Sequence, residues 1–166
     1  MYDVKLKTSY FPDQNDAELL QTTVGGLLRE ISTKHPDNEA LVEVDMEGTA
    51  RRRWTYAELF SDAERLAQAL ASRFEKGEKV CVWAPNIPEW ILMEYACGLA
   101  GLVLVTANPA YQPKELRYVL EQSEAVALFM VSEYRDNPMA KIAKEAIQGL
   151  HQLRECTDLE LSLIHI

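Results

Sequence analysis

Three short and almost wholly apolar runs constrain the fold more than any other feature of the sequence. They are KVCVWA at 79–84, LVLVTA at 102–107 and AVALFMV at 125–131. Runs of this length are typical of buried strands, and the segments 87–100 and 113–123 between them have helical character. Strands joined through helices run parallel, because the helical crossover returns the chain to the same end of the sheet. The sequence therefore predicts an α/β fold, with a parallel βαβαβ layer, right-handed connections and helices on both faces.

The preceding part of the chain predicts a helix and then a β-hairpin. Helical spacing begins near Thr23 and places four apolar side chains on one face: Val24, Leu27, Leu28 and Ile31. Residues 40–45, ALVEVD, alternate apolar and polar positions, and MEGT at 46–49 is typical of a turn. Arg51–Trp54 then returns as the second strand, so we expect an N-terminal β-hairpin ahead of the parallel layer.

The clearest helix is predicted over 55–74. Thr55 and Glu58 form a T-x-x-E capping box, which satisfies two backbone donors at the start of a helix. The apolar stripe of this helix comprises Leu59, Ala63, Leu66, Ala67, Leu70 and Phe74. A further helix is expected over 137–153, whereas the last residues, RECTDLELSLIHI, show no clear period.

Charge and hydropathy argue against a nucleic-acid or membrane protein. The net charge is −9, from 26 acidic and 17 basic residues, whereas phosphate binding needs clustered Lys and Arg. Arg51, Arg52 and Arg53 form the one basic cluster, and we interpret it as a charged strand edge. The longest apolar run, 95–107, is too short to span a bilayer, and the N-terminus lacks a signal-peptide core. We expect a cytoplasmic protein without a transmembrane segment.

Cysteine and histidine do not form a metal or disulfide pattern in this sequence. Cys81, Cys97 and Cys156 are odd in number and widely spaced, so we expect free thiols in a reducing compartment. Three histidines, His35, His151 and His165, lie far apart without a zinc-binding spacing. Three tryptophans, Trp54, Trp83 and Trp90, are expected to pack in the core and at its boundary, with a stacking platform as the alternative.

The turns after the predicted strands lack the glycines that bring backbone amides close to a phosphate. The sequence contains no G-x-G-x-x-G, no P-loop and no G-x-S-x-G nucleophile elbow. The most distinctive turn is NPAYQP at 108–113, whose prolines fix φ before the next helix. Asn108 and Tyr111 fall at the carboxyl end of a parallel strand, where α/β proteins tend to bind ligands. We interpret them as turn residues, with a supporting role near an active site as the alternative.

Five segments together resemble the acyl-CoA synthetases of the adenylate-forming, AMP-binding superfamily. They are HPDNEAL (35–41), WTYAEL (54–59), GEKVCVWAPNIPEWILMEYA (77–96), CGLAGLVLVTANPAY (97–111) and ELRYVLEQSEAVALF (115–129). The resemblance covers about residues 20–135, and the order and spacing of the segments make it specific. It implies part of the large N-terminal domain of these enzymes, in the form usual for fatty acyl-CoA ligases.

The resemblance implies a reaction in two halves. ATP and a carboxylic acid give an acyl-adenylate and pyrophosphate, with Mg²⁺ balancing phosphate charge, and coenzyme A then takes the acyl group. The family's phosphate loop, adenine-binding and ribose-binding motifs and catalytic Lys have no match in these residues. No catalytic, cofactor-binding or metal residue is therefore expected here. Fatty acids are the expected substrates, while luciferase-like and aryl-CoA ligase parents stay open.

These observations predict the organisation of the chain. Residues 1–20 are expected to form an N-terminal arm, 21–160 a partial AMP-binding domain, and 161–166 (LSLIHI) a non-native read-through tail, with a natural apolar C-terminus as the alternative. The chain is then an inactive N-terminal fragment of an acyl-CoA synthetase, whose partner is the missing remainder of the same chain. The alternative hypothesis is a complete, small α/β binding or interaction module that does no chemistry.

Overall fold

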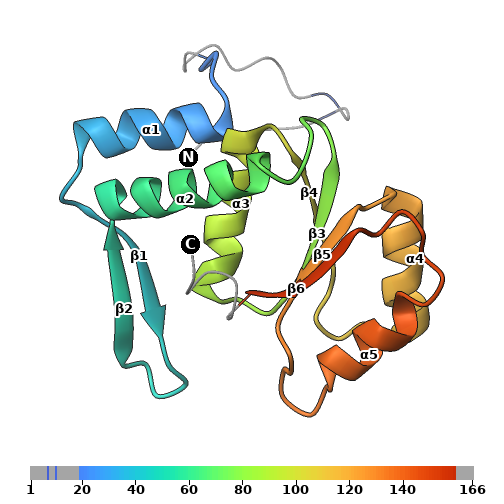
Figure 1. The fold of residues 1–166 in the computed structure, drawn as a ribbon. Helices are drawn as coiled ribbons and strands as arrows, with labels where there is room; N and C mark the ends of the chain where they lie inside the picture. The colour runs from blue at the N-terminus through green and yellow to red at the C-terminus, as the bar shows by residue number, and fades with distance from the viewer. Residues whose placement is uncertain (1–6, 8–9, 11–18, 160–166) are drawn as a thin grey trace.

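The structure is a computed structural model that describes residues 7, 10 and 19–159 (Figure 1). The predicted read-through tail lies outside the described residues, and so does most of the predicted N-terminal arm. The described part combines a two-stranded antiparallel hairpin with a four-stranded parallel sheet. The predicted α/β class, the hairpin and the parallel layer are confirmed.

The first elements follow the predicted order. Helix α1 is Val24–Lys34, and the side chain of Thr23 caps it by accepting from the amide of Gly26 at 3.0 Å. Strands β1 (Glu39–Val44) and β2 (Ala50–Thr55) form the hairpin. Helix α2 is Tyr56–Ala71, and both hydrogen bonds of the Thr55–Glu58 capping box are present. All six side chains of its predicted stripe are buried.

The parallel sheet contains β3 (Lys79–Trp83), β4 (Val103–Thr106), β5 (Ala127–Met130) and β6 (Glu155–Asp158) in the spatial order β4-β3-β5-β6. Three helices connect these strands: α3 (Pro88–Ala100), α4 (Pro113–Ser123) and α5 (Met139–Ala146). Figure 1 shows α1, α2 and α3 on one side of the sheet and α4 and α5 on the other. Helices therefore cover both faces, as the sequence predicts.

One strand was not predicted, and two predictions about these elements need correction. Strand β6 was not predicted, because four mostly polar residues carry no strand signal until β5 is beside them. The run at 102–107 is not a fully buried strand: β4 is an edge strand, and Val103 is 47% exposed. The helix predicted over 137–153 ends at Ala146. Gly149 then adopts φ +75°, a left-handed conformation that continues the chain toward β6 rather than the helix.

The predicted apolar face of α1 is also wrong in part. Leu28 is buried, but Val24 is 57% exposed and Leu27 is 37% exposed. The side that packs against α3 instead carries Gly25, where a Cβ atom would lie 2.8 Å from Cδ2 of Leu99. The glycine permits a close approach of the two helices, so its low helix propensity is offset by packing.

Candidate functional site: the carboxyl edge of the sheet and an apolar groove

The carboxyl ends of the parallel strands are where an α/β sheet tends to bind ligands, at the point where neighbouring connections leave on opposite faces. Strand β3 lies between β4 and β5. The chain leaves β3 toward α3 on one face, and leaves β5 toward α5 on the other (Figure 1). This topology makes the loops after β3, β4 and β5 the first candidate site.

The polar groups of the loop after β4 form hydrogen bonds within the loop and with a side chain of β3. The side-chain oxygen of Asn108 accepts from the amide of Ala110 at 2.9 Å, and its carbonyl accepts from the indole of Trp83 at 2.8 Å. The amide of Tyr111 donates to the same carbonyl at 2.9 Å. Pro113 occupies the first turn of α4, as predicted. These contacts confirm that NPAYQP is a strand-to-helix turn, and that the Asn108 side chain stabilises it.

The loop after β5 is tied to the same turn. The side chain of Asn137 donates to the carbonyl of Pro109 at 2.8 Å. Tyr134 and Asn137 exchange backbone hydrogen bonds of 3.1 and 3.0 Å, and Arg135 between them has φ +53°. The hydroxyl of Ser132 donates to the carboxylate of Asp158 at the end of β6. The polar groups of this edge therefore bond to one another and stabilise the loops.

The loops at this edge carry few of the groups that usually hold a phosphate or a metal ion. No group of three or more His, Cys, Asp and Glu side chains able to hold a metal ion occurs among the described residues. The loops after the strands contain proline and side-chain hydrogen bonds in place of a glycine-rich cradle. The described residues thus do not fit the triphosphate or Mg²⁺ of an ATP-dependent reaction, and no chemical step is assigned to them.

The predicted charged strand edge contains a more specific feature. The guanidinium of Arg52 donates through Nε to Glu43 at 2.6 Å, and through its two terminal nitrogens to Glu89 at 2.6 and 3.3 Å. Glu89 is 9% exposed and lies in the first turn of α3. The hydrogen bond from Arg52 lowers the pKa of Glu43, and the two carboxylates raise the pKa of Arg52.

We call the group Glu43–Arg52–Glu89 the arginine clamp. It joins both strands of the hairpin to a helix 37 positions further along the chain. The neighbouring arginines are paired as well, Arg51 with Asp45 at 3.5 Å and Arg53 with Glu39. All three arginines of the predicted charged strand edge are therefore paired with acidic side chains.

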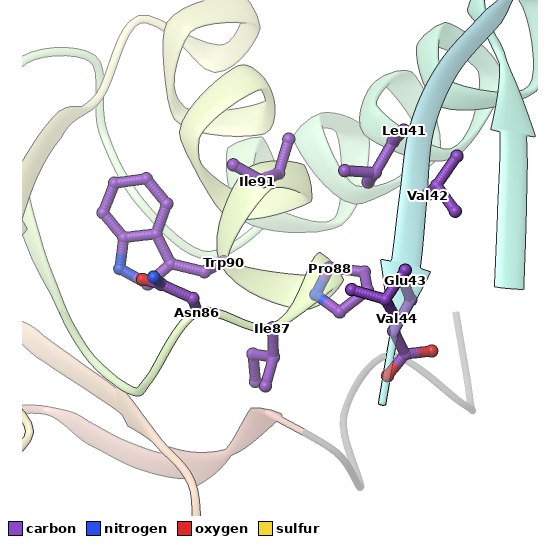
Figure 2. A pocket seen from close by; sticks show the side chains of 9 residues that line it. All are labelled: Leu41, Val42, Glu43, Val44, Asn86, Ile87, Pro88, Trp90 and Ile91. Atoms are coloured by element: carbon purple, nitrogen blue, oxygen red, sulfur yellow. The ribbon is translucent and has the colours of Figure 1, made fainter. Parts of the chain in front are cut away.

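Beside the clamp lies an apolar groove with a volume of about 460 Å³. Figure 2 shows its two walls, one formed by β1 and the other by the start of α3 and the loop before it. The lining residues are mostly apolar: Leu41, Val42, Glu43, Val44, Asn86, Ile87, Pro88, Trp90 and Ile91. Sequence reasoning missed the groove, because its walls come from segments that meet only in the folded chain.

The remaining predicted residues have structural roles. Trp83 is fully buried, while Trp54 and Trp90 are half-buried against the core, which confirms the packing interpretation. The indole of Trp54 donates to Asp62 at 3.0 Å. Cys81, Cys97 and Cys156 are free, and burial raises the pKa of Cys81 and Cys97 to about 12. His35 caps α1 through its backbone, His151 is exposed, and His165 lies outside the described residues.

A family model described as "AMP-binding enzyme" matches residues 28–164, which is most of the sequence. The chain belongs to the AMP-binding enzyme family. It is 37% identical over 139 residues to the putative acyl-CoA synthetase YngI of Bacillus subtilis, a match that covers 83% of this chain and 25% of YngI. It is 33% identical over 141 residues to the mitochondrial medium-chain acyl-CoA ligase ACSF2 of Danio rerio, covering 84% of this chain and 23% of ACSF2.

Solved structures of the family share this fold. A fatty acyl CoA synthetase of Mycobacterium tuberculosis superposes with a TM-score of 0.74 at 24% identity, over 86% of this chain and 28% of that one. The N-terminal domain of FACL13 from the same organism gives a TM-score of 0.73 at 23% identity, over 87% and 36%. The chain spans about a quarter of the length of the curated relatives that it matches. No helix among the described residues is long and apolar enough to cross a membrane.

Proposed function

We propose that this chain is the N-terminal part of an ATP-dependent acyl-CoA ligase and that it is inactive by itself. The observation that carries the proposal is the 37% identity to a putative acyl-CoA synthetase across 83% of this chain but only 25% of the relative. The parent enzyme would use ATP and Mg²⁺ to activate a carboxylic acid as an acyl-adenylate, and then transfer the acyl group to coenzyme A. We keep residues 21–160 as the extent of the partial AMP-binding domain.

The proposed substrate is a fatty acid. The support comes from two relatives, one named as a medium-chain acyl-CoA ligase and one described as a fatty acyl CoA synthetase. We keep the cytoplasm as the proposed compartment because all three cysteines are free thiols, although ACSF2 is named as mitochondrial.

The proposed inactivity follows from what the described residues do. Adenylate formation depends on charge stabilisation and positioning at the phosphates. The polar groups at the carboxyl edge instead form hydrogen bonds that stabilise the loops themselves, as the side chains of Asn108 and Asn137 do. We therefore assign no catalytic, cofactor-binding or metal residue within the described part of this chain. Asn108 and Tyr111 keep a proposed supporting role beside the site of the parent enzyme.

The test is pyrophosphate release by the purified chain with ATP, Mg²⁺ and carboxylic acids from acetate to palmitate and benzoate. We expect no acid-dependent release with any member of the panel. Acid-dependent release would refute the proposed inactivity. Tight binding of one of these acids without turnover would instead favour the binding-module hypothesis.

A further inference from the structure

Two side chains from outside the turn after β4 fix that turn at the carboxyl edge of the sheet. The indole of Trp83, the last residue of β3, donates to the carbonyl of Asn108 at 2.8 Å. The side-chain amide of Asn137, in the loop after β5, donates to the next carbonyl along the chain, that of Pro109, at 2.8 Å. Because these consecutive carbonyls accept from two different segments, the ends of β3, β4 and β5 are joined at one turn.

Asn137 uses both ends of its side-chain amide in this connection. Its side-chain oxygen accepts from the side-chain amide of Gln112, the residue before α4, at 3.5 Å. Its backbone carbonyl accepts from the amides of Tyr134 and Met139 at 3.1 and 2.9 Å. The residue is nevertheless only half-buried. A hydrogen bond in such a place makes a modest net contribution to the free energy of unfolding, so stability alone gives little reason for these contacts.

The loop that contains Asn137 also has a backbone conformation that is unfavourable by itself. Arg135 has φ +53°, in the left-handed region that residues with a Cβ atom seldom adopt. The backbone hydrogen bonds between Tyr134 and Asn137 close the turn around it. Conformations of this kind persist where the surrounding structure determines them, and they cluster at functional sites. Asn137 therefore joins a loop of fixed shape to the turn at Asn108–Tyr111.

We propose that Asn137 is a positioning residue for the ligase reaction of the parent enzyme. Its amide holds the turn with Asn108 and Tyr111 at a fixed distance from the loop after β5, so that the two loops present one rigid edge to a bound substrate. The inference rests on the proposed function and deepens it, because Asn108 and Tyr111 have a proposed supporting role there. A displacement of about 1 Å in groups that position a substrate can lower the rate about 100-fold.

Steady-state kinetics of a chimera test the inference. In the chimera, residues 1–159 precede the part of Bacillus subtilis YngI that follows its matched region. Asn137→Asp keeps the shape of the side chain but removes its donor, and Asn137→Leu removes donor and acceptor without adding a charge. In both variants the KM for the carboxylic acid or for coenzyme A should rise at least about tenfold, while kcat stays within about twofold. The KM for ATP should not change, because these loops lack a phosphate cradle.

A matched control separates positioning from general stability. Asn38→Asp makes the same chemical change at an exposed asparagine between α1 and β1, outside the parallel sheet. It should leave kcat and all three KM values unchanged. Unchanged KM values in a folded Asn137→Asp chimera, or a rise confined to the KM for ATP, would overturn the inference. Equal effects of Asn38→Asp and Asn137→Asp would overturn it as well. Far-UV circular dichroism confirms that the variants remain folded.

Hydrogen exchange in the chain itself separates failure of the inference from failure of the proposed function. The amides of Ala110 and Tyr111 donate to the side chain and the carbonyl of Asn108, inside the turn. In Asn137→Asp and Asn137→Leu both amides should exchange at least about fivefold faster, because the turn opens more often. Unchanged exchange would overturn the inference, whether or not the chimera is active. An inactive chimera combined with faster exchange would support the fixed turn and count against the ligase proposal.

Discussion

The arginine clamp gives the sharpest prediction for stability. Arg52→Met keeps much of the side-chain volume and leaves Glu43 and Glu89 without their cation. Breaking one partner out of a buried pair costs about 3–5 kcal/mol. The Arg52 side chain is 48% exposed and that of Glu89 is 11% exposed. Solvent screening of the exposed half reduces the expected loss in the free energy of unfolding to about 2 kcal/mol.

Urea unfolding followed by tryptophan fluorescence measures this loss, with the buried Trp83 as the main probe. With a slope of about 2 kcal/mol per molar urea, the midpoint should fall by about 1 M. The control is Arg53→Met, whose ion pair with Glu39 has side chains that are 57% and 51% exposed. That change should cost less than about 1 kcal/mol, because exposed pairs contribute little.

A double-mutant cycle assigns the effect to the pair. Glu89→Gln alone should also lower the free energy of unfolding. The two single losses, for Arg52→Met and Glu89→Gln, should sum to clearly more than the loss in the double variant, because each single change removes the same interaction. Additive losses, or an Arg53→Met variant as unstable as Arg52→Met, would refute the reasoning.

Three further predictions follow from pKa shifts and packing. The hydrogen bond from Arg52 lowers the pKa of Glu43 below its ordinary value of 4.5. The stabilisation that ionised Glu43 contributes is therefore fully present above pH 4.5, and it is lost as the pH falls through the lowered pKa. Acid titration of the unfolding free energy should therefore show a shallower decline in Arg52→Met, and an identical decline would contradict this. At pH 8, Ellman's reagent should label the exposed Cys156 before the two buried thiols, although burial also raises the pKa of Cys156. Cys81 and Cys97 should react only after unfolding, since burial raises the pKa of both to about 12. Equally fast labelling of all three would contradict this. Gly25→Ala should lower the unfolding free energy by about 1 kcal/mol, as overpacking outweighs the gain in helix propensity. Gly98→Ala is the control, because its added Cβ would lie 3.7 Å from the nearest atom, and it should not lower the free energy of unfolding. Equal losses in the two variants would contradict the close approach of α1 and α3 at Gly25.

The sequence predicted those parts of the fold whose signals are local. The capping box at Thr55 needs only residues three apart, and the strand ending in Trp83 is apolar after its first residue, so both can be predicted from the sequence. Val103 shows the limit of this reasoning: an apolar run does not tell an edge strand from a central one, because the difference depends on which strands pair. Strand β6 is recognisable only beside β5, since its own residues are mostly polar.

The candidate site was less accessible to sequence reasoning than the fold. Arg52 was predicted to lie on a charged strand edge, and it does. Its bond to Glu89, 37 positions away, arises only when α3 packs beside the hairpin. Likewise the groove lies between β1 and the start of α3, where Ile87 and Trp90 are placed. A Glu in the first turn of a mostly apolar helix was the one available signal, because a buried carboxylate needs a cation.

The proposal that this chain is the opening part of an acyl-CoA ligase is tested most directly with the chimera in which residues 1–159 precede the part of Bacillus subtilis YngI that follows its matched region. The readout is acid-dependent formation of AMP and acyl-CoA. With ATP, Mg²⁺, coenzyme A and fatty acids, the chimera should form both products, whereas residues 1–166 and the YngI remainder should each form neither. A folded chimera with no turnover on any acid of the panel, or turnover by residues 1–166 alone, would contradict the account.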